Sequence, residues 1–174
     1  LRVLRALQLT ARFELQLSET TRTLCRQIEL DDLPPERIWG EFEKLLLQAP
    51  RPSLGFTLAL DLGVTRKLFP ELGTLVGCPQ EPEWHPEGDV WTHNLLVIDQ
   101  ARSFIDDLPR TQKIALMLGA VCHDLGKPAT TALLNGRIRS HNHEEAGVKP
   151  TCSLLDRLRV QTLDGYNVRG QVTG

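Results

Sequence analysis

Three residues of the chain, His93, His123 and Asp124, carry side chains that commonly hold a divalent metal ion. Asp124 follows the apolar residues 114–122, which predict a buried helix ending in a carboxylate. Both burial and the negative end of the helix dipole disfavour a carboxylate at that position. A cation must therefore compensate it, and two candidates fit: the Lys127 ammonium, or a divalent metal shared with His93 and His123.

Two further histidines, His141 and His143, follow in the segment Ser-His-Asn-His-Glu-Glu. Asn142 can cap the next helix with Glu145 at its third position, which is a capping box and gives Glu145 a structural role. His143 then lies at the first helical position, where free backbone N–H groups suit an anion. We interpret His143 as catalytic together with Asp124, either as a second-metal ligand or as a phosphate contact. His141 is either part of the same site or simply exposed.

A loop rich in proline and glycine, residues 77–89, precedes His93 and contains His85 and Asp89. A loop histidine between Trp and Pro is typical of packing or hydrogen bonding. A direct role for His85 or Asp89 in the chemistry is the alternative interpretation.

Helical periodicity dominates the elements that must position these residues. Ser18 is suited to cap one helix, and Pro34-Pro35 to start the next. Asn135-Gly136 predicts a hairpin turn within residues 128–140, and Gly126 is expected to end a helix as its left-handed residue. The predicted helices begin at the first residue and after Ser18, and then cover residues 37–47, 53–62, 65–76, 90–106, 110–125, 142–159 and from 163 onward.

These elements predict an all-α fold with one short β-hairpin. We expect a helical domain over residues 1–76, a linker loop over 77–89 and a second helical domain over 90–174 that is truncated at its C-terminal end. The 174 residues are 41% hydrophobic and 24% charged, which excludes a disordered or collagen-like chain. Because the first residue already lies in a helical pattern and no stop signal ends the sequence, we expect a fragment of a longer protein.

The composition of the chain also indicates its cellular compartment and whether it is attracted to nucleic acid or lipid. The four cysteines lie far apart and no signal peptide is visible, which predicts reduced thiols and a cytoplasmic protein. The longest apolar stretch, residues 114–122, is too short to cross a membrane. A net charge of −2 gives no general attraction to nucleic acid or to anionic lipid.

The order of the candidate residues resembles the HD superfamily of metal-dependent phosphohydrolases. The similar motifs are His93, then His123-Asp124-Leu-Gly-Lys127, then Gly136-Arg-Ile-Arg139 and His143-Glu144. The resemblance implies an all-helical scaffold in which His93, His123 and Asp124 bind the metal. The later metal-binding aspartate of that superfamily has no match here, and we expect it beyond Gly174.

A second resemblance extends over essentially the whole chain. Residues 1–13 look like the helix that follows the E-D-x-x-R motif of bacterial tRNA nucleotidyltransferases, and residues 35–44 are similar to the neck motif of that family. Residues 81–93 resemble the entry to the HD domain in one branch of these CCA-adding enzymes. The resemblance implies that Arg2 helps to select CTP or ATP and that tRNA is the partner. The acidic pair before Arg2 and the catalytic head are not in the sequence, so the chain alone is not expected to add nucleotides.

The leading hypothesis is therefore a part of a CCA-adding enzyme with an HD domain that hydrolyses phosphomonoesters or 2′,3′-cyclic phosphodiesters. Lys127, Arg137 and Arg139 are the candidate phosphate contacts, and Mg, Mn, Ni or Co fits the mixed ligand set. Two alternatives stay open. One is a non-catalytic, RNA-binding helical body with a degenerate HD domain, and the other is an independent HD nucleotidase.

Overall fold

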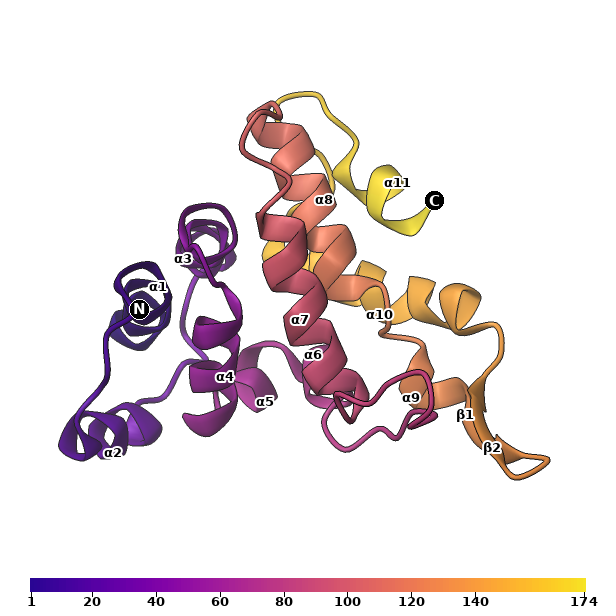
Figure 1. Cartoon of the computed structure of the whole chain (residues 1–174). Coiled ribbons are helices and arrows are strands. Elements are labelled where there is room, and N and C mark those ends of the chain that lie inside the picture. Colours follow the sequence, from indigo (N-terminus) through magenta and orange to yellow (C-terminus); the bar gives the residue numbers. More distant parts are fainter.

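The apolar stripes of the sequence form helices in the computed structural model, which describes residues 1–174 (Figure 1). The first half holds α1 (Arg2–Phe13), α2 (Glu19–Gln27), α3 (Pro35–Gln48), α4 (Ser53–Asp61), α5 (Val64–Leu68) and α6 (Pro70–Gly73). The second half holds α7 (Val90–Arg102), α8 (Arg110–Cys122), α9 (Lys127–Thr130), β1 (Thr131–Leu134), β2 (Arg137–Ser140), α10 (His143–Leu158) and α11 (Val168–Thr173). The predicted all-α fold with one short hairpin is confirmed.

Side chains at the helix starts explain where several of these elements begin. The Ser18 hydroxyl accepts a hydrogen bond from the Thr21 amide at the start of α2, as predicted. Pro35 is the first residue of α3, where its missing N–H costs nothing. Asp89 caps α7 by accepting from the Thr92 amide at 2.9 Å, which gives this loop carboxylate a structural role.

Two predicted helices differ from the observed ones. Residues 65–76 form no single helix, because Pro70 begins a new short helix after the non-helical residue Phe69. The last helix starts only at Val168, since Asp164 and Gly165 both have left-handed backbone angles and make a tight turn before it.

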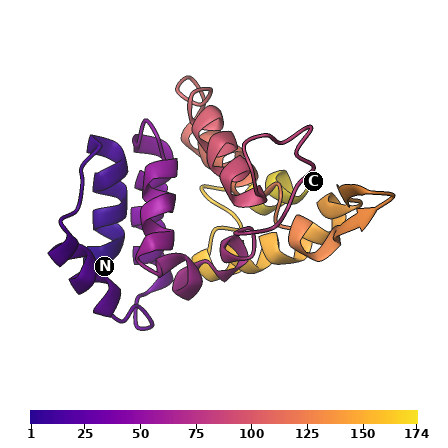
Figure 2. The ribbon, with the colours of Figure 1, turned by 60° about the horizontal axis from the view of Figure 1, so that its bottom comes forward.

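The β-hairpin is confirmed, and its turn has the residues that its geometry needs. β1 and β2 pair antiparallel, with Leu134 opposite Arg137, so the connection has two residues. Asn135 and Gly136 have φ values of 53° and 75°, which suit a two-residue turn with the twist of the strands. Figures 1 and 2 show the hairpin projecting from the helical body beyond α9.

One hydrophobic cluster of 37 buried residues runs through both halves of the chain. In the first half α1 packs on α3 and α4, and in the second half α8 packs against α7 and α11. Helix α3 contacts α8 and α10, and α4 contacts α7, which joins the halves (Figure 2). Residues 77–89 form a loop without helix or strand, as predicted, while the division into two domains stays a prediction. No helix is both long enough and apolar enough to span a bilayer.

A part-buried ion pair fastens α10 to α6. The Arg157 guanidinium donates to both Glu71 carboxylate oxygens, and the Ser153 hydroxyl donates to Glu71 Oε1 at 2.8 Å. Burial raises the pKa of Glu71, but the bonds from Arg157 and Ser153 outweigh burial and hold that pKa below its usual value. The contact therefore stabilises the folded state only while Glu71 is ionised.

We expect Glu71→Gln to lower the free energy of unfolding by about 1–2 kcal/mol at pH 7, because two charge-assisted hydrogen bonds are weakened. The stabilisation is complete above the pKa of an unfolded glutamate, about 4.3, and disappears as the pH falls through the lower folded pKa. Urea denaturation of both proteins between pH 7 and pH 3 measures the difference. A difference that stays constant over this range would show that the Glu71 charge contributes nothing.

Candidate metal centre

Asp124 lies at the centre of the candidate site, and three histidines from three elements surround it. His123 Nε2 lies 3.2 Å from Asp124 Oδ2, and His93 Nε2, from the first turn of α7, lies 4.0 Å from the same oxygen. His143 Nε2, from the start of α10, lies 3.6 Å from Asp124 Oδ1. The potential ligand atoms of His93, His123 and Asp124 all lie within 4.8 Å of one another.

The other ring nitrogen of each histidine is held by an acceptor. His123 Nδ1 lies 2.8 Å from the Ala120 carbonyl, and His143 Nδ1 lies 2.8 Å from the Ser140 carbonyl. A carbonyl oxygen only accepts, so both Nδ1 atoms carry a proton, and in the neutral imidazole each Nε2 has the lone pair that a metal ion needs. Metal-binding histidines in proteins have this arrangement, in which an outer partner fixes the tautomer and the ring.

Asp124 itself is held as an anion in a buried position. Its side chain is 2% exposed, and Oδ2 has no hydrogen bond of acceptable geometry. Burial raises the pKa of Asp124, but the His123 imidazole and the Lys127 ammonium outweigh it and lower the pKa to about 2. A buried carboxylate surrounded by the Nε2 atoms of three imidazoles offers the mixed oxygen and nitrogen ligands that suit a divalent cation.

Lys127 is also present at this centre. Its Nζ lies 2.8 Å from Asp124 Oδ2 and donates to Gln80 Oε1 at 2.7 Å. Both cations that the sequence suggested for Asp124 are therefore compatible with the structure. Gln80 gives the ammonium a second acceptor, so Lys127 keeps a partner when another cation takes its place at Asp124.

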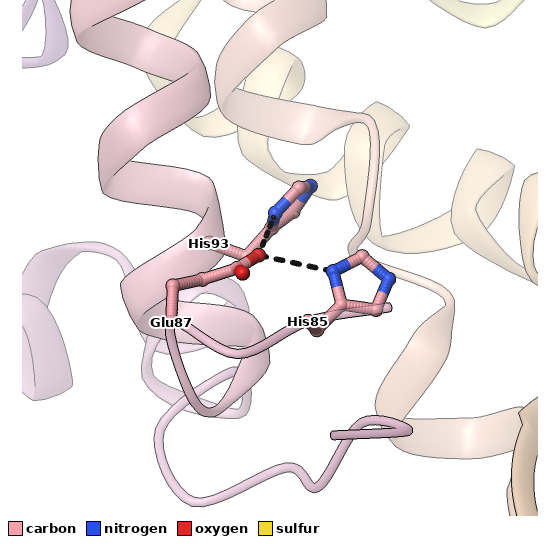
Figure 3. Close-up of side chains that lie close together, drawn as sticks. All are labelled: His85, Glu87 and His93. Atoms are coloured by element: carbon pink, nitrogen blue, oxygen red, sulfur yellow. Dashed lines mark hydrogen bonds and ion pairs between the residues drawn. The ribbon is translucent and has the colours of Figure 1, made fainter. Parts of the chain in front are cut away.

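The outer partner of His93 is Glu87, which the sequence motifs did not indicate. Figure 3 shows the Glu87 carboxylate between two imidazoles: Oε1 lies 2.7 Å from His93 Nδ1 and 3.0 Å from His85 Nδ1. The two rings meet edge to face with centroids 4.8 Å apart. The bond from His85, the loop backbone and the bond from His93 together lower the pKa of Glu87 to about 2. Its only signal in the sequence was a carboxylate in the loop between the two histidines.

We expect Glu87→Gln to weaken divalent metal binding by about 10–100-fold, because an outer-shell carboxylate fixes the ring and raises its basicity. Titration calorimetry with Mn²⁺ or Ni²⁺ measures the affinity. Glu145→Gln is the matched control, since Glu145 is exposed at the start of α10 and makes no side-chain bond. Equal affinity in Glu87→Gln and the wild type would remove Glu87 from the site.

Two local predictions around His143 and Asp124 are wrong. Asn142 does not cap α10 with its side chain, because its backbone is left-handed at φ 57°, and no capping box with Glu145 forms. His143 nevertheless starts the helix. Gly126 is not a left-handed helix end, since its φ is −85°. Glycine is needed here because the backbone of α10 packs directly against this residue. A Cβ on Gly126 would lie 1.9 Å from the His143 carbonyl oxygen.

A buried asparagine links the two helices that carry the ligands. Asn94, next to His93 in α7, is almost fully buried, and its amide donates to the Val121 carbonyl in the last turn of α8 at 3.3 Å. The bond fixes the position of His93 relative to His123 and Asp124.

A cavity of about 250 Å³ lies beside the centre. Lys127 and His143 face both the cavity and Asp124, and His85, Arg139 and His141 also line it. Arg137 is not part of the lining and pairs with Glu83 at 3.1 Å. Arg2 is exposed at the start of α1, in the other half of the chain (Figure 1).

Comparison with known proteins gives two findings. A family model described as "Probable RNA and SrmB- binding site of polymerase A" matches residues 14–75. Proteins named "Multifunctional CCA protein" match most of the chain. The protein of Laribacter hongkongensis is 40% identical over 163 residues, 91% of this chain and 38% of its own length. The protein of Pasteurella multocida is 38% identical over 169 residues, 92% of this chain and 39% of its own length.

A third such protein, from Cupriavidus metallidurans, is 39% identical over 164 residues. The chain spans about two fifths of the length of the curated relatives it matches. No solved structure matches it. The similarity confirms the resemblance to CCA-adding enzymes that was drawn from the sequence motifs.

Proposed function

The chain is a relative of the multifunctional CCA proteins over nine tenths of its length, and we propose that its second half acts as a metal-dependent phosphohydrolase. The observation that carries the proposal is the convergence of the His93, His123 and Asp124 side chains, with each ligand atom within 4.8 Å of the others. The substrates would be phosphomonoesters or 2′,3′-cyclic phosphodiesters.

His93, His123 and Asp124 would hold the metal through Nε2, Nε2 and a carboxylate oxygen. When bound, a divalent ion activates a water molecule as nucleophile and polarises the phosphoryl group. Glu87 and the Ala120 carbonyl keep the two imidazoles in the binding tautomer. Asp124 is ionised at neutral pH because its pKa is about 2.

Three residues that line the cavity, Lys127, Arg139 and His143, would act on the phosphate. Lys127 and Arg139 place positive charge in the cavity, where they would neutralise charge that develops on the phosphoryl oxygens. His143 keeps its Nε2 toward the same space, since Nδ1 is held by Ser140. His143 can therefore bind a second cation or accept a proton there.

We further propose that the first half binds tRNA in the intact protein, where Arg2 would contact CTP or ATP during nucleotide addition. The family model over residues 14–75 describes an RNA-binding site and supports this role. The names of the relatives support CCA addition by the whole protein.

Metal removal and return tests the phosphohydrolase. The intact protein is treated with EDTA, dialysed and given Mg²⁺, Mn²⁺, Co²⁺ or Ni²⁺ in turn, and phosphate release or ring opening is measured. We expect no hydrolysis without metal and recovery with at least one of the four ions. No hydrolysis with any ion, in an intact protein that stays folded, would contradict the proposal.

A second candidate function rests on the 2.8 Å contact between Lys127 and Asp124. If this ion pair alone compensates the buried carboxylate, the second half is a structural support for an RNA-binding body. That hypothesis predicts no metal binding by calorimetry, which separates it from the first.

A further inference from the structure

The cavity beside the metal centre has two walls that are fastened to each other. One wall is the loop of residues 80–85, and the other is strand β2. The Ile138 amide donates to Glu81 Oε2 at 2.9 Å, and Arg137 pairs with Glu83 at 3.1 Å. The cavity is therefore built by contacts between distant segments, and does not depend on a single free loop.

The lining of this cavity combines two kinds of chemistry. Lys127 and His143, which also face Asp124, supply an ammonium and an imidazole, and Arg139 adds a guanidinium. Trp84 and Ile138 supply apolar surface to the same cavity. A ligand that uses both kinds of group has an anionic group joined to a flat apolar ring.

Trp84 differs from the other tryptophans of the chain. Trp39 and Trp91 are buried, at 9% and 6% exposure, whereas Trp84 is 64% exposed. None of the aromatic pairs of the chain includes Trp84, and no arginine or lysine covers its ring. An indole that the fold does not use for packing, on the wall of a cavity with phosphate-binding groups, is free to stack on a ligand.

We propose that Trp84 is a nucleobase-stacking platform that makes the site prefer nucleoside phosphates over simple phosphate esters. The inference rests on the proposed function and adds the part of the substrate that is recognised. Every base has a π-face, so stacking on Trp84 accepts any of the bases. A cavity of 250 Å³ lies just below the usual range for ligand sites, about 300–1000 Å³, and suits a single nucleotide.

Binding is tested without turnover, by tryptophan fluorescence in EDTA. Adenosine 2′,3′-cyclic phosphate should quench the emission of the wild type, because Trp84 is the exposed tryptophan. Trp84→Phe should lose the quench, and glycerol 2-phosphate, which has no base, should cause none. A control variant, Phe104→Ala, removes another exposed aromatic ring at 68% exposure and should keep the quench.

The kinetic test compares the same two substrates with the metal present. Trp84→Ala should raise KM for the adenosine substrate by about 5- to 100-fold, the range expected for one lost base–aromatic stack. It should leave KM for glycerol 2-phosphate unchanged, and Trp84→Phe should restore most of the affinity.

The outcomes separate the two proposals. Hydrolysis with equal KM in Trp84→Ala and the wild type, or a quench that persists in Trp84→Phe, would overturn the platform while leaving the hydrolase intact. A wild type without quench would overturn the platform as well. A Trp84-dependent quench in a chain that hydrolyses nothing would keep the platform and reject the hydrolase.

Discussion

Asp124→Asn is expected to abolish metal-dependent hydrolysis. The loss of activity should exceed the decrease of about 10–100-fold that follows removal of an outer-shell partner. The substitution keeps the volume of the side chain and removes the only anionic ligand among the three converging groups. Nucleotide addition, proposed above for the intact protein, should persist, since Asp124 lies in the second half of the chain and the proposed nucleotide contact Arg2 lies at the start of α1. Hydrolysis and nucleotide addition are measured on the same full-length preparation.

A second readout does not depend on activity. A metal at 100 times its Kd stabilises a protein by about 2.7 kcal/mol, so the wild type should melt at a higher temperature with metal than with EDTA. Asp124→Asn should lose this difference. Asp106→Asn is the control, because Asp106 is an exposed carboxylate paired with Arg102 on the far end of α7. A metal-induced shift that survives in Asp124→Asn would refute the ligand assignment.

Gly126→Ala is expected to destabilise the fold by about 3 kcal/mol or more, at the upper end of overpacking effects. The new Cβ would lie 1.9 Å from the His143 carbonyl oxygen and 2.5 Å from the Gly147 nitrogen. Both are backbone atoms of α10, so no side-chain rotation relieves the clash. The helix must move away from the His123-Asp124 turn, which also displaces His143 from Asp124.

Gly119→Ala in α8 is the matched control. Nothing lies within 4 Å of a Cβ at Gly119, and alanine is favoured over glycine inside a helix by about 0.5–1 kcal/mol. The midpoint of urea denaturation should therefore fall for Gly126→Ala and rise for Gly119→Ala. A Gly126→Ala protein as stable as the wild type would mean that α10 does not approach this turn closely.

Local signals in the sequence predicted most of the fold. Ser18, Pro35 and the Asn135-Gly136 pair act through contacts with their own neighbours, so their roles followed from the sequence. The convergence of His93 with the His123-Asp124 pair joins distant segments; it was expected from the order of motifs that resembles the HD superfamily, and the fold brings these side chains together. Their role as metal ligands stays a prediction.

Other features that depend on distant segments were not predicted. Gly126 is determined by the backbone of α10, and Glu87 by where the loop carries it relative to α7. Asn142 has the residue type of a helix cap, but its backbone is left-handed where the chain passes from the hairpin into α10. In each case the residue type was visible, and its partner or its backbone was decided by tertiary structure.

The Asn94–Val121 hydrogen bond has a consequence for the thermodynamics of metal uptake. The bond and the surrounding core set the spacing of the ligand-bearing helices by protein contacts alone. The conformational entropy of ordering the ligands is thus lost during folding and not during metal binding. Small zinc modules, by contrast, fold only with their metal. Chelation should accordingly leave a native chain that takes up metal again without refolding, and the heat-capacity change on binding should be small.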